Sequence, residues 1–177
     1  MPPSRFLQKG YKARKYKENE DFKGMIKILF VCHGNICRSP MAEFMLKDMA
    51  AKAGLSEQFQ IDSAAISTEE IGNPMYPPAR KKLEEHGIVC EKRAARQLTD
   101  ADYWDYDLII GMDEENMRGI KKICGADLSH KCALMMNFTD RPGTEVADPW
   151  YTRDFDQTYR DLEDGCKGLL SKLRRSV

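Results

Sequence analysis

The sequence predicts an α/β fold of three layers, a four-stranded parallel sheet with helices on both faces and an anion-binding loop after the first strand. Apolar runs of strand length alternate along the chain with amphipathic stretches, which is the pattern of β-α-β units. The chain has 177 residues, enough for one domain with a sizeable core and too few for two comfortable ones. A loop of unusual composition, VCHGNICRSP (31–40), lies between the first apolar run and the first amphipathic stretch. Doubly wound sheets bind their ligands at such a position.

The first strand is predicted at 26–31, from the apolar run IKILFV. The stretch after the loop predicts the first helix, with Ser39 as N-cap, Pro40 at the first helical position and Gly54 as the stop. Methionines recur at every fourth residue of this helix, and we expect this stripe to face the sheet. Its members are Met41, Met45 and Met49.

The middle of the chain predicts a second strand at 58–66, a polar loop at 67–78 and a short helix at 79–86 that ends at Gly87. Thr99 stands three residues before Asp102, which is a weak capping signal for another short helix.

The second half continues the alternation. The third strand is expected at 107–112, a helix at 113–124, the fourth strand at 131–138 and a polar loop at 139–152. In the last helix, apolar residues follow a 4-3-4-3-4 spacing that indicates one buried face. These residues are Phe155, Tyr159, Leu162, Cys166, Leu169 and Leu173. Two glycines, Gly165 and Gly168, each cost roughly 0.5 to 1 kcal/mol relative to alanine and leave the ends of this helix less certain.

Composition excludes several classes of protein. Hydrophobic residues make up 42% and charged residues 32%, which argues against global disorder. Lys plus Arg and Asp plus Glu each number 28, so net charge gives no ground for a nucleic-acid or membrane partner. No apolar stretch approaches the roughly 18 to 20 residues that span a bilayer, and the N-terminus lacks a signal-peptide core. We expect a cytoplasmic protein whose six cysteines are free thiols.

Residues 1–24 differ from the rest of the chain. They carry seven Lys/Arg and three Asp/Glu, a local charge of +4, and show neither strand nor helix periodicity. We expect a flexible basic N-terminal extension here and a single folded domain at 25–177, with Met25 as a natural start.

The loop at 31–40 combines a nucleophile with an anion site. Backbone N–H groups from His33 to Arg38, beside a helix N-terminus, form a nest for phosphate or sulfate. Gly34 is expected to relieve a position of unusual φ, and Asn35 is the non-glycine residue that best tolerates a left-handed turn. Five residues separate Cys32 from Arg38, so a tight loop places the thiol below the anion and the guanidinium over it.

The same groups are expected to activate the sulfur. Amides, helix dipole and Arg38 stabilise negative charge on Cys32, and Ser39 is placed to donate its hydroxyl to the thiolate. The same loop is thus expected to activate the cysteine and to bind the anion that the cysteine attacks.

With C-x5-R-S inside VCHGNICRSP, directly after the first strand, the sequence resembles the low-molecular-weight protein tyrosine phosphatases. The resemblance extends over essentially all of 25–177 and includes DSAA (62–65), GNP (72–74), HGI (86–88) and DPWY (148–151). It implies a phosphatase domain of this family at 25–177, without a metal or other cofactor. The implied partner is a phosphotyrosine-containing protein, with inorganic phosphate as product and inhibitor.

The resemblance also implies a double displacement. Cys32 attacks phosphorus in line and forms a phosphocysteine, while Arg38 and the loop amides meet the charge on the equatorial oxygens. Asp148 protonates the leaving phenolate and then, as a carboxylate, activates the water that hydrolyses the intermediate. Trp150 and Tyr151 offer aromatic surface on which a phenyl ester stacks.

The substrate pocket is expected to consist of His33, Gly34, Asn35, Ile36, Cys37, Ser39, Glu69, Trp150 and Tyr151. Asn35 and Ser63 are carried over as residues that support the loop, and Cys37 as a redox partner that protects Cys32 by a reversible disulfide. Family members often carry an aromatic or large apolar residue where this chain has Glu69 followed by Glu70. This acidic wall favours phosphotyrosine flanked by basic residues.

Two other site chemistries fit the sequence less well than an anion-binding loop. A zinc site has poor ligand spacing when drawn from Cys32, His33, Cys37, Cys124, His130 and Cys132. A Cys-His hydrolase is also disfavoured, because His33 is the sequence neighbour of Cys32 and projects elsewhere.

Three relatives of the loop are closer alternatives. Arsenate reductases of similar fold relay oxidation through a further cysteine pair, for which Cys124 and Cys132 are candidates, although both follow the loop late in the chain. Phosphoarginine phosphatases resemble this loop but carry threonine where this chain has His33. A sugar-transport phosphocarrier has a similar cysteine loop, but Arg38 and Asp148 would have no function in such a protein.

Overall fold

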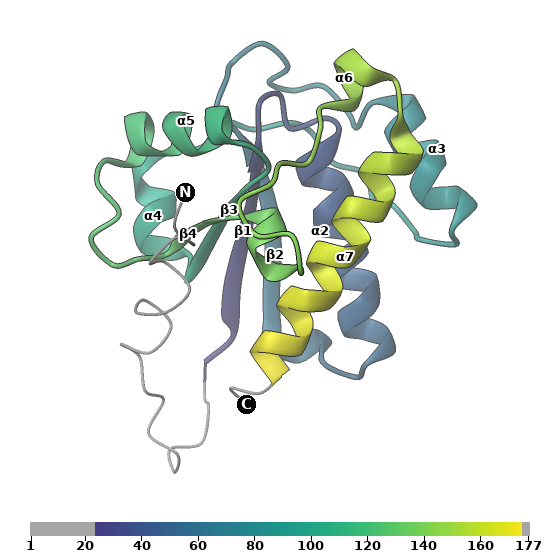
Figure 1. Cartoon of the computed structure of the whole chain (residues 1–177), viewed down its shortest axis with the longest axis horizontal. Helices are drawn as coiled ribbons and strands as arrows, with labels where there is room; N and C mark the ends of the chain where they lie inside the picture. The colour runs from purple at the N-terminus through teal and green to yellow at the C-terminus, as the bar shows by residue number, and fades with distance from the viewer. Residues whose placement is uncertain (1–23, 175–177) are drawn as a thin grey trace.

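The structure, a computed structural model that describes residues 24–174, has the predicted three-layer α/β fold. Its four strands are parallel and lie in the order β2-β1-β3-β4. They are β1 (Ile26–Cys32), β2 (Phe59–Ala65), β3 (Leu108–Gly111) and β4 (Cys132–Leu134). Helices α4 (Asp100–Asp105) and α5 (Glu114–Cys124) cover one face of the sheet. Helices α2 (Arg38–Lys52), α3 (Pro77–Glu85) and α7 (Phe155–Arg174) lie on the other face (Figure 1).

Side chains of the central strand β1 alternate between two apolar cores. Ile28 and Phe30 enter the larger core, which α2 and α7 also line, while Leu29 and Val31 enter the smaller core beside α4 and α5. All four are fully buried. A strand that is covered on both faces needs apolar residues at every position, which explains the continuous run IKILFV. The methionine stripe of α2 packs into the larger core as predicted.

Several predicted boundaries are wrong. Helix α3 begins at Pro77 instead of residue 79, and a short helix, α6 (Pro149–Thr152), lies inside the predicted polar loop at 139–152. Two further errors have a clear physical cause. Helix α2 begins at Arg38 with Cys37 as its N-cap, two residues earlier than expected, because the Ser39 hydroxyl turns toward the loop instead of capping the helix. The fourth strand ends at Leu134, and the apolar run continues as a 3-10 helix, η2 (Met135–Phe138). Met135 and Met136 are fully buried in the core that α7 shares, so burial beneath a helix produced an apolar run that resembled a strand.

The two glycines of α7 allow this helix to pack directly against η2. A Cβ atom at Gly168 would lie 1.7 Å from the carbonyl oxygen of Phe138, and one at Gly165 would lie 2.6 Å from Cε of Met135. The predicted apolar stripe of α7 is buried, apart from Phe155, which is partly buried against the same core. The glycines are therefore sites of close approach rather than weak points in the helix.

Two short elements complete the fold, the 3-10 helix η1 (Ser56–Gln58) and helix α6 (Pro149–Thr152). The capping signal before α4 is confirmed, since the backbone N–H of Thr99 donates to the Asp102 carboxylate at 2.8 Å. Almost all of the predicted basic extension, residues 1–23, lies outside the described residues. Within 24–174, every helix is too short or too polar to cross a membrane.

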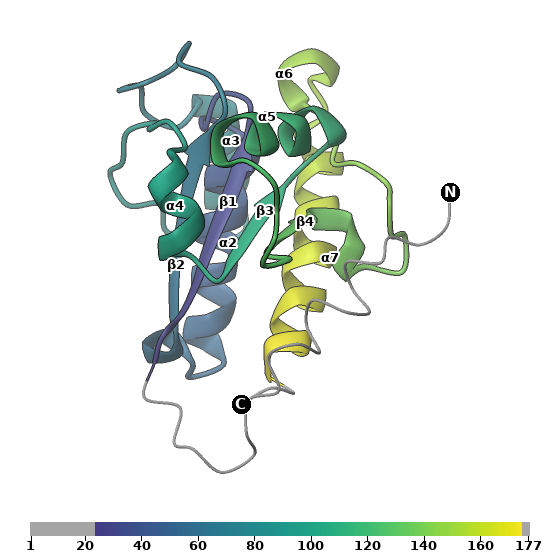
Figure 2. The same ribbon diagram turned by 90° about the vertical axis from the view of Figure 1, so that its left-hand side faces the viewer.

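The carboxyl ends of the strands bring distant segments together. The loop after β1, the start of α5 and the short helix α6 all lie at this end of the sheet (Figures 1 and 2). Strands β1 and β3 are neighbours, with Val31 opposite Gly111, so the residues that follow each strand meet here. This is the topological switch point at which a doubly wound sheet forms its binding crevice.

Candidate active site

The loop between β1 and α2 turns sharply at Asn35. Its φ of 58° is the left-handed conformation expected for this residue. Gly34, for which an unusual φ was predicted, is not among the residues of positive φ, so that expectation is wrong. A Cβ atom at Gly34 would instead lie 3.3 Å from Cγ of Glu70, so a small residue here serves the close approach of two loops.

The Cys32 sulfur lies at the base of this loop and faces two hydrogen-bond donors. It lies 3.0 Å from the Ser39 hydroxyl and accepts the backbone N–H of Asn35 at 3.3 Å. The Ser39 hydroxyl itself accepts the Asn35 side-chain amide at 2.9 Å, which leaves its proton free to point at the sulfur. Donors from two sides stabilise negative charge on this atom.

Behind the loop, Asn35 is the centre of a buried polar network. Its side-chain amide donates to Ser39 and also to Ser63, each at 2.9 Å. The Ser63 hydroxyl donates a hydrogen bond to the Glu43 carboxylate at 2.5 Å. The structure thus places Asn35, Ser39 and Ser63 behind the loop, where they support it and do not line its pocket.

The second loop cysteine, Cys37, is chemically unlike Cys32. Burial raises the pKa of the Cys37 thiol, and the negative charges of Cys32 and Asp148 raise it further. Cys37 therefore stays protonated, and the hydrogen-bond donors of the loop converge on the sulfur of Cys32 instead. Of the two cysteines, Cys32 is the one placed to act as a nucleophile.

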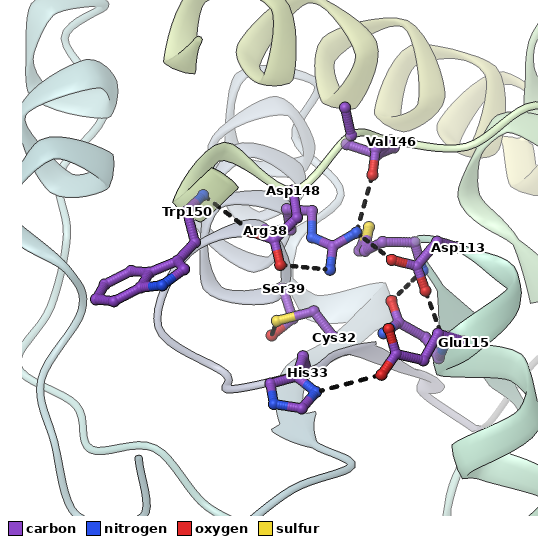
Figure 3. A network of polar contacts seen from close by, with 12 residues as sticks. Cys32, His33, Arg38, Ser39, Asp113, Glu115, Val146, Asp148 and Trp150 are labelled. Atoms are coloured by element: carbon purple, nitrogen blue, oxygen red, sulfur yellow. Dashed lines mark hydrogen bonds and ion pairs between the residues drawn. The ribbon is translucent and has the colours of Figure 1, made fainter. Parts of the chain in front are cut away.

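Arg38 is almost fully buried and is held by three acceptors (Figure 3). Its Nη1 donates to Asp113 at 2.6 Å and to the Val146 carbonyl at 2.8 Å, and its Nη2 donates to Asp148 at 3.3 Å. Burial by itself lowers the pKa of Arg38, but the negative charges of Cys32, Asp148 and Asp113 together raise it above its usual value. A guanidinium has five N–H donors. Three contacts leave two donors for an anion that enters the pocket.

Asp148, the N-cap of α6, borders the pocket beside Arg38. One carboxylate oxygen accepts the backbone N–H of Trp150 at 3.0 Å, and the other faces Arg38 at 3.3 Å. Its side chain remains 23% exposed. A carboxyl group fixed in this way, yet reached by solvent, suits proton transfer to a bound group and from water.

A pocket of about 120 Å³ opens between these groups. It is lined by Cys32, His33, Gly34, Ile36, Cys37, Arg38, Glu69, Glu70, Asp148, Trp150 and Tyr151. The loop forms the floor, and Trp150 and the 82% exposed Tyr151 form an aromatic side. The Trp150 ring is steadied by Tyr76, whose ring centroid lies 5.1 Å away, and by the Arg153 guanidinium at 5.3 Å.

The opposite rim of the pocket is acidic. The His33 ring lies between two glutamates, with Nε2 3.1 Å from Glu69 and Nδ1 3.9 Å from Glu115. Glu70 also lines the pocket. His33 thus points away from Cys32 toward the rim, as expected for its immediate sequence neighbour (Figure 3).

Sequence reasoning missed several groups that shape the site, and three of them hold Arg38 or Asn35 in place. Asp113 follows β3 and caps α5, so an acidic residue at the carboxyl end of a predicted strand was a usable signal. The Val146 carbonyl carries no such signal, because any residue supplies one. Arg93 donates to both oxygens of Asn35 from an irregular segment between α3 and α4, and nothing in its local sequence marks it.

The competing chemistries find little support in this arrangement. Among residues 24–174, no group of three or more His, Cys, Asp or Glu side chains is arranged to hold a metal ion. His130 and Cys132 line a separate hollow beside α5. Neither Cys124 nor Cys132 lines the pocket of Cys32, whereas a redox relay proceeds by direct thiol–disulfide exchange with the nucleophile.

Comparisons with known proteins identify the family of this chain. The model of the low molecular weight phosphotyrosine protein phosphatase family matches residues 27–177. Among similar proteins, low molecular weight protein-tyrosine-phosphatase YfkJ of Bacillus subtilis is 40% identical over 152 residues, which cover 85% of this chain and 97% of YfkJ. The low molecular weight phosphotyrosine protein phosphatase of Gallus gallus is 36% identical over 82% of this chain and 94% of its own.

Solved structures give the same result. The crystal structure of YfkJ superposes with a TM-score of 0.84 at 36% identity, over 88% of this chain and 98% of that one. Vibrio vulnificus Wzb, solved in complex with benzylphosphonate, superposes with a TM-score of 0.73 at 28% identity, over 84% and 99%. The chain belongs to the low molecular weight phosphotyrosine protein phosphatases, a family of hydrolases.

Proposed function

We propose that this protein hydrolyses phosphotyrosine monoesters in proteins through a phosphocysteine on Cys32. The observation that carries the proposal is the convergence of three groups on one pocket. A cysteine sulfur that faces two donors lies at its floor, a buried arginine with two donors to spare lies beside it, and a partly exposed aspartate lies at its mouth.

In the first step, Cys32 forms a bond to phosphorus as the bond to the phenolic oxygen breaks. Arg38 and the loop amides bind the equatorial oxygens, on which charge gathers in a loose transition state. Protonated Asp148 gives its proton to the departing phenolate. The tyrosine leaves neutral, and the enzyme keeps a phosphocysteine and an Asp148 carboxylate.

In the second step, Asp148 takes a proton from water as the water oxygen bonds to phosphorus and the sulfur leaves as a thiolate. The Ser39 hydroxyl and the Asn35 N–H stabilise this thiolate as a leaving group. Inorganic phosphate is the product, and it competes with substrate because it binds the same donors.

Aromatic walls favour a phenyl ester over the flexible side chain of phosphoarginine. Trp150, Tyr151 and the supporting ring of Tyr76 offer flat apolar surface beside the phosphate site. The binding of benzylphosphonate, an aromatic compound, by the similar Wzb supports this preference.

The acidic rim favours basic residues next to the phosphotyrosine. Glu69 and Glu70 line the pocket, and Glu69 and Glu115 both face the His33 ring. Phosphopeptides with flanking lysines are expected to show a several-fold higher kcat/KM than peptides with flanking glutamates, and Glu69→Gln should narrow that ratio at low salt. Equal kcat/KM for the two peptides would contradict the preference.

Cys37 is proposed to protect Cys32 under oxidation. After peroxide converts Cys32 to a sulfenic acid, the Cys37 sulfur displaces water to form a disulfide, which a thiol reductant reverses. Wild type should regain activity with dithiothreitol after peroxide treatment, whereas Cys37→Ser should not. Equal recovery would contradict this role.

Residues 25–177 are proposed to form the complete catalytic domain in the cytoplasm, with residues 1–24 as an extension that catalysis does not need. A protein that starts at Met25 should hydrolyse p-nitrophenyl phosphate with unchanged kcat. Loss of this activity would contradict the proposed domain boundary.

The main test compares wild type, Cys32→Ser and Asp148→Asn on p-nitrophenyl phosphate, phosphotyrosine and phosphoarginine. Wild type should prefer phosphotyrosine, and Cys32→Ser should be inactive because its hydroxyl is a poor nucleophile without a base. Asp148→Asn should lose about 10²- to 10⁴-fold in kcat, most strongly on substrates with a poor leaving group. Full activity of Cys32→Ser would refute the mechanism, and a preference for phosphoarginine would refute the substrate.

A further inference from the structure

We propose that Arg93 is a positioning residue of this active site, which fixes the conformation of Asn35 and orients the hydrogen bonds that converge on the Cys32 sulfur. The inference rests on the phosphatase function proposed above and names a residue outside the loop, in the irregular segment between α3 and α4.

Arg93 grips both oxygens of one residue. Its Nη1 donates to the backbone carbonyl of Asn35 at 2.7 Å, and its Nη2 donates to the side-chain Oδ1 of Asn35. The backbone N–H of Arg96 donates to the same Oδ1 at 3.1 Å. Asn35 is the loop residue with positive φ, a conformation that costs a non-glycine residue free energy unless its surroundings fix it. Arg93 supplies that restraint.

Together with the Arg96 N–H, Arg93 also sets the direction of the hydrogen bonds that follow. A guanidinium only donates, so it requires the oxygen of the Asn35 amide, and the amide nitrogen then faces Ser39 and Ser63. Ser39 accepts from that nitrogen and therefore points its own proton at Cys32. The reversed Asn35 amide would place its NH₂ group against the guanidinium and leave Ser39 free to turn its proton away from the sulfur.

The positive charge of Arg93 stabilises negative charge on the Cys32 sulfur, as its hydrogen bonds do. Burial lowers the pKa of Arg93, while the negative charges that face it, Glu43 and the Cys32 sulfur, act against that shift. Arginine remains a cation in such surroundings. Glu43 also accepts from Ser63 and from Lys47, so it is shared among three groups and only partly balances Arg93. The remaining positive charge lies behind the nucleophile and favours its thiolate form.

The test measures the thiol directly. Wild type, Arg93→Gln and Arg93→Lys are alkylated with iodoacetamide across pH, and modification of Cys32 is followed by mass spectrometry. Steady-state kcat and KM for p-nitrophenyl phosphate and far-UV circular dichroism accompany each variant. Arg96→Gln is the matched control, because the Arg96 guanidinium pairs with Asp102 and only its backbone reaches Asn35.

Arg93→Gln should move the midpoint of the alkylation profile upward by about half a unit to one unit. Its kcat should fall about tenfold, with less change in KM, because the loop still offers its amides to phosphate. Arg93→Lys keeps the charge but cannot hold two oxygens in a planar fork, so its midpoint should stay near that of wild type while kcat falls several-fold. Arg96→Gln should keep the wild-type midpoint.

A folded Arg93→Gln protein with the wild-type midpoint would overturn the proposal, as would an equal shift in Arg96→Gln. If Arg93→Gln does not fold, Arg93→Lys decides, because wild-type kcat in that variant would overturn the two-oxygen grip. Alkylation needs only the thiol, so this result is independent of the substrate. Failure of wild type to hydrolyse phosphotyrosine would refute the proposed function. The alkylation profile would still decide whether Arg93 positions the loop.

Discussion

Substitution of Gly168 by alanine separates two opposing effects on stability. Gly168 lies within α7, where intrinsic helix propensity favours alanine over glycine by about 1 kcal/mol. The new methyl group would lie 1.7 Å from the Phe138 carbonyl oxygen. Carbon–oxygen contacts in proteins lie at about 3.3 Å or more, so α7 and η2 would have to separate by roughly 1.6 Å.

The clash should win over the propensity. The atom that is met belongs to the backbone of η2 and cannot rotate away, and the neighbouring Met135 and Met136 are fully buried. Overpacking of a core costs about 1–3 kcal/mol, and a backbone contact belongs near the upper end of that range. After the gain in propensity is subtracted, we expect a net destabilisation of about 2 kcal/mol. For a chain of this size, that corresponds to a decrease in Tm of about 4–8 °C.

The assay is urea-induced unfolding followed by circular dichroism, with the m-value checked for a change in the denatured state. Gly165→Ala is the matched control, because its methyl group would meet only the flexible side chain of Met135, at 2.6 Å from Cε. It should stay within about 1 kcal/mol of wild type. The reasoning is refuted if Gly168→Ala is as stable as wild type, or if the two variants lose the same free energy.

Two further predictions concern the site and the pH dependence of stability. Asp113→Asn keeps the cap of α5 but removes the charge that anchors Arg38, so kcat should fall about tenfold while KM does not rise; an unchanged kcat would contradict the anchoring role. Burial and the hydrogen bond to Asp62 raise the pKa of Tyr106 to about 12 from 10.0, so its contribution to stability is complete below pH 10 and is lost as pH rises toward 12. The pair is only partly buried, so its contribution to the free energy of unfolding is discounted to about half, or about 1 kcal/mol. Between pH 9 and pH 11, urea unfolding should therefore show a smaller loss of unfolding free energy for Tyr106→Phe than for wild type. The same loss in both proteins would contradict the assignment.

The sequence by itself determined the parts of this protein that depend on neighbouring residues. The alternation of apolar and amphipathic runs indicated the sheet and its helices, because strand and helix periods are local properties. The loop after β1 was identified from its own composition, and the left-handed turn at Asn35 followed from the tolerance of asparagine for that conformation. The spacing of Cys32 and Arg38 was enough to suggest a nucleophile beneath an anion.

Only the tertiary structure decided which distant groups meet that loop. Asp113 reaches Arg38 because β3 lies beside β1, and Arg93 reaches Asn35 from an irregular segment; neither contact leaves a local pattern. Ser39 looked like a helix cap from its position, yet its hydroxyl serves Cys32, since the loop offered it a partner that the sequence could not display. From the sequence, the two glycines of α7 only lower the helix propensity, whereas in the structure they allow η2 to pack closely against the helix. Local signals set the conformation of a segment, whereas strand order and packing set its partners, because those depend on the path of the whole chain.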